Sequence, residues 1–291
     1  MELLVTLKKI EYLKKLKEFG VKGVICGTPV FSSRFFFNLE ELKQIKQECV
    51  NNGLDLYVSI DTMIEEKDRL LLIEYLDFLK KLDVDGIYFS DLAVYSVAKD
   101  FGLEDLLIYD PTTLMTNSLD ANFYLSLGIS SVVLAREITL EEILNIAKRT
   151  DNRVEMQIFG YLKTATSKRR FLSNYFKHLG QTYDVTDKES LRIVEETRDY
   201  EMPILENKYG TQIFTDYILN TYIEYPVLSK VLKRGIIDDI FLSEAELFDV
   251  LRDYSSLNED NASLLLNNLK LKYYDRSFDT GYLYQKTNTT K

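Results

Sequence analysis

Short runs of β-branched and aromatic residues alternate with longer amphipathic stretches along most of this chain of 291 residues. We expect eight strands, at residues 3–6, 23–26, 54–60, 86–89, 106–109, 131–135, 154–159 and 239–242. Helical patterns separate most neighbouring strands, which predicts a parallel sheet with right-handed crossovers. Eight such units favour a closed (βα)8 TIM-like barrel of the α/β class. An open doubly wound sheet is the alternative, since periodicity cannot show closure.

One segment interrupts this alternation. After a helix-like stretch at residues 167–178, the chain becomes polar and extended, with strand-like runs at 192–194 and 203–205 and a turn at 207–210. We interpret residues 180–217 as an inserted β-hairpin region within a single domain spanning residues 1–291. A helix over residues 217–233 is expected to lead back to the last strand, and two further helical stretches follow, at 244–254 and 260–272.

Composition limits the class of protein. No run of roughly eighteen apolar residues is present, so no membrane-spanning segment is expected, and the N-terminus lacks the pattern of a signal peptide. We therefore expect a cytoplasmic enzyme or binding protein. The net charge of −10 argues against general nucleic-acid affinity, although a local basic site is compatible with it.

Several segments carry a resemblance to a known family. They are VLAREITLEEI at 133–143, EMQIFG at 155–160, GIYFSDLAV at 86–94, Ser33-Arg34 with Phe37-Asn38, EETR at 195–198 and PILENKYGTQI at 203–213. Taken in their order along the chain, they resemble motifs of the collagenase-like peptidase family U-32, over roughly residues 20–245. The second segment matches the start of the family pattern E-x-F-x-x-G, with Gln157 in place of phenylalanine. The resemblance implies the barrel fold, and the name of the family implies a link to proteolysis.

The chain departs from the family pattern at the positions of its cysteines. Lys163 and Arg170 stand where cysteine-bearing members have the first two cysteines, and the downstream cysteine stretch is absent. An iron–sulfur cluster normally needs four thiolates, so the cluster of those members is expected to be absent and no cofactor is predicted. The pattern resembles the shorter partner of paired bacterial U-32 proteins. That likeness implies a role in making hydroxyuridine at the tRNA wobble position, a reaction linked in the family to prephenate.

Polar residues at the predicted strand ends form the first candidate site, because chemistry in a parallel barrel takes place at the carboxyl ends of the strands. These residues are Arg34, Asp61, Asp91, Asn117, Arg136, Glu137, Gln157 and, in the hairpin region, Glu206. Arg34 and Arg136 are suited to bind a small anionic metabolite. Asp61, Asp91 and Glu137 are candidate catalytic bases, or hold the arginines in place. The alternative is that these residues form helix caps and structural ion pairs.

A basic segment, residues 161–182, is the second candidate site. It contains Lys163, Lys168, Arg169, Arg170 and Lys177, with four aromatic residues interleaved and no acidic residue. Basic groups neutralise phosphates and aromatic rings stack on unpaired bases, so we predict RNA binding here. The alternative is a helix with buried aromatic rings and solvated lysines. The chain has one histidine, which excludes a multi-histidine zinc site, and we predict no metal site.

These observations favour a cluster-free component of tRNA hydroxylation, with tRNA and a cysteine-bearing U-32 relative as partners. The runner-up is a collagenase-like peptidase, with a metal bound by Asp61, Asp91 and Glu137. A third interpretation is a non-catalytic subunit with a degenerate pocket. Whether the chain is itself an enzyme is left open by the sequence.

Overall fold

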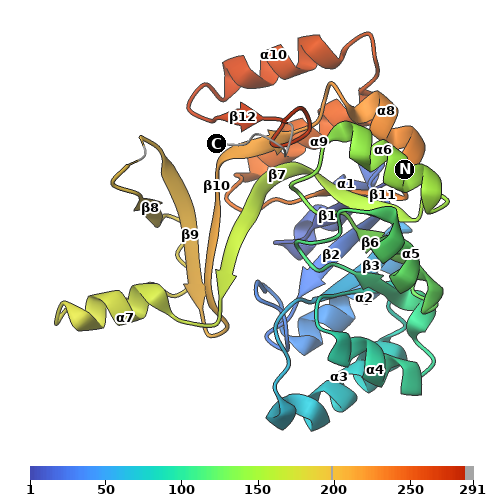
Figure 1. The fold of residues 1–291 in the computed structure, drawn as a ribbon, viewed down its shortest axis with the longest axis vertical. Helices are drawn as coiled ribbons and strands as arrows, with labels where there is room; N and C mark the ends of the chain where they lie inside the picture. Colours follow the sequence, from blue (N-terminus) through green and yellow to red (C-terminus); the bar gives the residue numbers. More distant parts are fainter. Residues whose placement is uncertain (198, 286–291) are drawn as a thin grey trace.

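A computed structural model describes residues 1–197 and 199–285 (Figure 1). Eight parallel strands form the barrel: β1 (Glu2–Thr6), β2 (Gly23–Gly27), β3 (Asp55–Ile60), β4 (Gly86–Phe89), β5 (Leu107–Tyr109), β6 (Ser131–Val133), β7 (Val154–Ser167) and β11 (Arg234–Ile237). Strands β1 to β7 pair in sequence order, and β11 pairs with both β7 and β1. The predicted closed barrel is confirmed, and the open sheet is excluded.

Helices surround this barrel. They are α1 (Leu13–Glu18), α2 (Leu39–Asn52), α3 (Arg69–Leu82), α4 (Leu92–Asp100), α5 (Ser118–Ser126), α6 (Leu140–Arg149), α8 (Tyr225–Val231), α9 (Glu244–Ser256) and α10 (Ala262–Lys272). Short 3-10 turns occur at Ile10–Tyr12, Glu66–Asp68 and Glu104–Leu106. Capping boxes begin α2, α6 and α9, where the side chains of Asn38, Thr139 and Ser243 accept hydrogen bonds from the first turn. Among the described residues, no helix is both long enough and apolar enough to cross a bilayer.

A β-arm projects beside the barrel (Figure 1). The outer half of β7 leaves the barrel and pairs antiparallel with β10 (Gly210–Asn220), which pairs with β9 (Glu201–Asn207), and β9 with β8 (Arg192–Val194). Helix α7 (Phe171–His178) lies at the far end of the arm, and β12 (Phe278–Asp279) pairs with β10 near its base. The predicted strands at 192–194 and 203–205 and the turn at 207–210 all lie in this arm. Arg198, part of one motif segment, lies outside the described residues.

Gly160 marks the point where β7 leaves the barrel. Its φ angle is +116°, in a region that favours glycine, and a Cβ built on it would lie 2.3 Å from the carbonyl oxygen of Asp238. The end of β11 therefore approaches β7 more closely here than any side chain would allow. This close approach explains why a glycine stands at the end of the motif EMQIFG.

Three predicted elements differ from the structure. The eighth strand is Arg234–Ile237, not 239–242, because the apolar run 240–242 packs as a buried loop after the strand has ended. The strand predicted at 154–159 continues to Ser167, so the following helix begins at Phe171. The helix predicted over 217–233 is only Tyr225–Val231. The chain is still in β10 up to Asn220, and Pro226 is suited only to the first turn of a helix.

An ion pair is buried in the barrel at the closing strand. Arg234 Nη1 lies 2.6 Å from Oε1 of Glu155, a residue with no exposed surface, and Arg234 Nε lies 3.1 Å from Oε2 of Glu2. Tyr88 also donates to Glu155, at 2.6 Å. Glu2 and Glu155 are the register partners of Arg234 on the two flanking strands. Arg234 thus joins both sides of the seam that closes the barrel.

The Arg234→Met substitution is expected to destabilise the fold by about 3–5 kcal/mol, because it leaves the Glu155 carboxylate buried without its cation. The double change Arg234→Met/Glu155→Leu should recover most of this loss, because no charge then remains buried. Urea unfolding followed by circular dichroism measures both. Lys230→Met, at the exposed pair with Glu259, is the control and should cost no more than about 1 kcal/mol. A double variant as unstable as the single one would contradict this account.

Candidate functional site

A cavity opens at the carboxyl ends of the barrel strands, with a volume of about 130 Å³. Five of the residues predicted from the sequence line it: Arg34, Asp61, Arg136, Gln157 and Lys163. They come from the loops after β2, β3 and β6 and from β7 itself. Below the cavity, an apolar layer fills the barrel, formed by Leu4, Ile25, Tyr57, Tyr88, Ile108, Val133 and Ile236. The cavity is therefore a closed-bottomed hollow rather than a pore.

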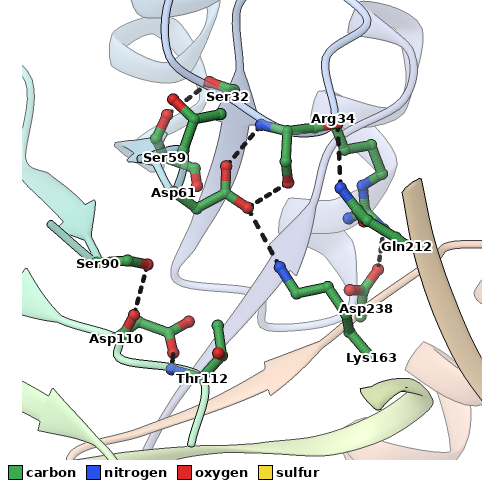
Figure 2. A network of polar contacts seen from close by, with 12 residues as sticks. Ser32, Arg34, Ser59, Asp61, Ser90, Asp110, Thr112, Lys163, Gln212 and Asp238 are labelled. Atoms are coloured by element: carbon green, nitrogen blue, oxygen red, sulfur yellow. Dashed lines mark hydrogen bonds and ion pairs between the residues drawn. The ribbon is translucent and has the colours of Figure 1, made fainter. Parts of the chain in front are cut away.

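Asp61 anchors one side of the cavity (Figure 2). Its carboxylate accepts a hydrogen bond from the backbone N–H of Ser33 at 2.6 Å and another from the Ser33 hydroxyl. Lys163 Nζ lies 3.4 Å from the same carboxylate. Burial alone would raise the pKa of Asp61, but Lys163 and the two Ser33 contacts together lower it below its usual value. Asp61 is thus a fixed anion that positions Lys163, and it is a poor proton acceptor.

Arg34 forms the matching contact on the other side of the cavity (Figure 2). Its Nη1 lies 2.7 Å from Oδ1 of Asp238, which directly follows β11. Burial would raise the pKa of Asp238, but Arg34 and the backbone N–H of Ile240 lower it. Burial tends to lower the pKa of Arg34, and the carboxylates of Asp238 and Asp239 outweigh it and raise the pKa. The pair stays ionised.

Asp239 lies behind this pair, fully buried. Thr6, at the end of β1, donates to Oδ1 of Asp239 at 2.7 Å, while Oδ2 has no hydrogen-bond partner among the described residues. Burial raises the pKa of Asp239 to about 6, although Lys8 and Arg34 oppose the shift. The pKa values of these two adjacent carboxylates therefore shift in opposite directions, because only Asp238 forms a salt bridge with an arginine.

Arg136 is the cation of the cavity that no carboxylate neutralises. Its Nη1 donates to the backbone carbonyl of Lys163 at 2.7 Å, and no carboxylate forms a salt bridge with it within residues 1–197 and 199–285. Gln157 lies beside it and donates from Nε2 to the carbonyls of Phe159 and Tyr161. The remaining guanidinium donors of Arg136 are therefore available to an anionic group of a ligand.

The arm completes the wall of the cavity. Asn207 and Gln212 donate from their side-chain amides to the carbonyl of Ser33, at 2.8 and 3.3 Å. Tyr209 donates to the carbonyl of Pro29 and accepts from the N–H of Phe31. These contacts fix the arm against the loop that follows β2, so the cavity lies between barrel and arm.

The other four strand-end candidates do not line the cavity. Asp91 caps α4, accepting from the N–H groups of Ala93 and Ile64, and Asn117 caps α5. Glu137 is half-buried in the turn after β6. Glu206 is buried and accepts from the N–H groups of Leu172 and Ser173 in the first turn of α7.

The carboxylates proposed as a metal site are therefore not gathered at the cavity. Asp61 lines it, whereas Asp91 and Glu137 do not. No group of three or more His, Cys, Asp or Glu residues in the described part of the chain is arranged to hold a metal ion.

The basic segment is divided between the cavity and the arm. Lys163 faces the cavity, whereas Lys168 pairs with Glu65 at 2.8 Å and Arg170 lies 3.5 Å from Glu206. Arg169 and Lys177 are exposed. Helix α7 buries none of its side chains, and Phe171 and Tyr175 are 47% and 58% exposed. The alternative of a helix with buried aromatic rings is wrong.

Sequence reasoning missed several lining residues: Thr6, Ser33, Ser59, Asp110, Gln212 and Asp238. Asp238 has no strand-end signal when the last strand is predicted at 239–242, because it then precedes the strand, whereas the strand ends at Ile237. A correct boundary at Ile237 would have identified it as a strand-end carboxylate. Gln212 carries no such signal, since only the folding of the arm brings β10 to the barrel.

The residues present do not fit a cysteine-ligated iron–sulfur cluster. The chain has two cysteines, Cys26 in β2 and Cys49 in α2, and both are buried. Burial raises the pKa of Cys26 well above its usual value and that of Cys49 to about 12, so neither is a thiolate at neutral pH. At the family's cysteine positions, Lys163 and Arg170 form ion pairs instead.

Asp239→Asn is expected to stabilise the protein at pH 8 by about 3 kcal/mol, because a pKa raised from 3.8 to about 6 means that the folded state resists ionisation. The folded state holds this proton more tightly than the unfolded chain. Stability from Asp239 is therefore present below about pH 4 and is lost as the pH rises to about 6. The advantage of the variant should grow across this interval and then level off. Urea unfolding between pH 4 and pH 8 measures it.

Asp100→Asn, at an exposed position, is the control, and its effect should not vary with pH in this way. An Asp239→Asn variant less stable than the parent at pH 8 would contradict the assignment.

Comparisons with known proteins agree with this architecture. The chain is 25% identical over 309 aligned positions to "tRNA hydroxylation protein P2" of Bacillus subtilis, covering 98% of both chains. It is 28% identical to an uncharacterized protease of Methanocaldococcus jannaschii, covering 99% of this chain and 74% of the relative. A solved U32 peptidase shares the fold, with a TM-score of 0.50 and 16% identity over 82% of this chain and 92% of that one. The model of peptidase family U32 matches residues 8–290, and the chain belongs to that family.

Proposed function

We propose that this protein is a cluster-free component of tRNA wobble-uridine hydroxylation. In this role it binds RNA along its arm and a small anionic metabolite in the barrel cavity, beside a cysteine-bearing U32 partner. The proposal is supported by similarity to a tRNA hydroxylation protein along the whole chain. The observation that carries it is the exposed basic and aromatic surface formed by α7 and Arg169, which precedes it, in a protein of net charge −10.

The arm surface has the two features that RNA binding needs. Arg169 and Lys177 are exposed cations that can neutralise phosphates, and Phe171 and Tyr175 present ring faces to solvent. Phe176 packs against Tyr183, with ring centroids 5.1 Å apart, but Phe171 and Tyr175 are 47% and 58% exposed, so packing does not account for their exposed surface. Glu206 contributes by holding the first turn of α7 on the arm.

The cavity has the charge pattern of a site for one anionic group. Asp238 neutralises Arg34 and Asp61 neutralises Lys163, which leaves Arg136 as the cation with free donors. A third carboxylate, Asp110, also lines the cavity and accepts from the backbone N–H of Thr112. A carboxylate or phosphate that binds Arg136 therefore displaces no existing salt bridge. Its volume of about 130 Å³ favours a small metabolite over a nucleotide.

The redox chemistry is assigned to the partner. Hydroxylation of a uracil C–H bond is a two-electron oxidation, and neither Lys163 nor Arg170 can carry electrons. A lysine at this position binds and orients anions instead. The chain then supplies RNA binding and ligand positioning, and the cysteine-bearing relative supplies the oxidising centre.

Reversing two exposed charges on the arm, Arg169→Glu/Lys177→Glu, is expected to weaken tRNA binding and to lower the slope of log K against log salt by about 2. Each lost cation removes about one phosphate contact. Fluorescence anisotropy of labelled tRNA at several salt concentrations measures both quantities. Lys99→Glu/Lys148→Glu changes the net charge equally on exposed barrel helices and should leave the slope unchanged. Equal effects of the two double variants would contradict an RNA site on the arm.

Arg136→Met is expected to lower hydroxyuridine in cellular tRNA at least about tenfold, because a charge-assisted hydrogen bond to the metabolite is lost. Nucleoside mass spectrometry of a deletion strain complemented with each variant measures this. Arg149→Met, at an exposed position of α6, is the control and should restore the modification fully. Unchanged hydroxyuridine in the deletion strain would refute the proposal. Gelatin cleavage by the purified protein that is lost in Asp61→Ala would favour the peptidase alternative.

A further inference from the structure

Three consecutive phenylalanines follow Arg34, and the fold places them in three different environments. Phe37 is buried in the core at 5% exposure, and Phe35 packs edge-on against Tyr209 of the arm, with ring centroids 6.4 Å apart. Phe36 is 41% exposed, and it lines the cavity. Two of the rings therefore have a structural role, whereas Phe36 presents a large apolar surface to solvent at the rim of a polar site.

A rigid loop fixes Phe36 in its exposed position. The N–H of Thr28 donates to Ser32 Oγ at 2.9 Å, and that hydroxyl donates to the carbonyl of Ser59 at 2.6 Å. Asp61 holds the next residue, Ser33, by its N–H and its hydroxyl. The neighbouring Arg34 is fixed by Asp238. These contacts fix the backbone before Phe36, and the buried Phe37 with Asn38, which caps α2, fixes it after Phe36, so the ring is held at the rim.

The polar groups near Phe36 have unused acceptors. Gln157 donates through Nε2 to two carbonyls, and Gln212 donates through Nε2 to the carbonyl of Ser33. This leaves the amide oxygens of both side chains able to accept a hydrogen bond from a ligand. An aromatic ring beside a few hydrogen-bonding groups is how proteins bind an unstacked base, by its face and by its edge.

We propose that Phe36 is the platform on which an unpaired pyrimidine base of bound RNA stacks at the cavity rim. The edge of the base faces Gln157 and Gln212, and Arg136 remains for the anionic metabolite. This inference rests on the proposed function, and it places an unpaired base at the mouth of the cavity that holds the metabolite. An apolar side chain of a protein partner is a poorer occupant, since it would cover the amide oxygens without donating to them.

The absence of tryptophan from this chain allows a direct test. Phe36→Trp creates a single fluorescent indole at the rim, and Phe123→Trp creates one at an exposed position of α5 as the matched control. Each variant is titrated with single-stranded oligouridine and with an abasic oligomer of equal length and charge. We expect oligouridine to quench the fluorescence at position 36, the abasic oligomer to leave it unchanged, and neither oligomer to affect position 123.

A second measurement separates this inference from the proposed function. Anisotropy of labelled oligouridine should show binding that is weakened roughly 5- to 100-fold by Phe36→Ala, the loss expected for one stacked base, with the salt slope unchanged. If RNA binds but the indole at position 36 does not respond, or responds equally to the abasic oligomer, the stacking platform is wrong and RNA binding stands. If no RNA binds to the parent protein, both proposals fail.

Discussion

Arg234 lies on the strand that closes the barrel, and its guanidinium contacts carboxylates on both neighbouring strands. Besides packing in the core, this contact holds the closing strand against both of its neighbours. Strand β11 has four residues, so backbone pairing alone gives few bonds to each neighbour. The position of β11 also decides where Asp238 lies, since that residue follows the strand directly. With β11 inserted between β7 and β1, Asp238 meets Arg34 and Asp239 meets Thr6. The polar mouth of the cavity is thus a consequence of how the barrel closes.

Lys163 and Arg170 stand where the family resemblance implies cysteine, and they lie in separate environments. Lys163 lies in the cavity and pairs with Asp61, whereas Arg170 lies on the arm and pairs with the buried Glu206. In the cavity, the contact with Asp61 gives Lys163 a fixed partner. On the arm, Arg170 helps to neutralise the carboxylate that accepts from the first turn of α7. The two cations therefore belong to unrelated local structures.

The sequence predicted the barrel because eight strand-helix units leave few other topologies, and it predicted Arg34, Asp61 and Arg136 because they follow those strands. Gln157 was predicted within the seventh strand, and Lys163 was predicted as an RNA contact. The remaining lining residues required information that periodicity does not contain. Ser33 and Asp238 depend on the ends of strands and loops, which polar patterns locate only to within a few residues. Gln212 depends on the arm folding back onto the loop after β2, through contacts made by Asn207 and Tyr209. Asp91, Asn117 and Glu206 look like site residues in sequence because the residues that cap helices are also polar residues at strand ends.

The charges of the arm and those of the cavity act on a ligand at different distances. With a net charge of −10, the barrel repels a polyanion at long distance, and at physiological salt this repulsion decays over about 8 Å. Helix α7 projects from the barrel, and Arg169 just before it and Lys177 within it are exposed cations, so this is the part of the molecule that an RNA backbone can approach first (Figure 1). In the cavity, by contrast, Arg34 and Lys163 are in salt bridges, and Arg136 keeps donors for contact at short range. Under the proposed function, the arm would govern association with RNA and the cavity would select the small ligand. The arm also forms one wall of that cavity, through Gln212 and Phe214, so RNA bound to the arm as proposed would lie next to the cavity.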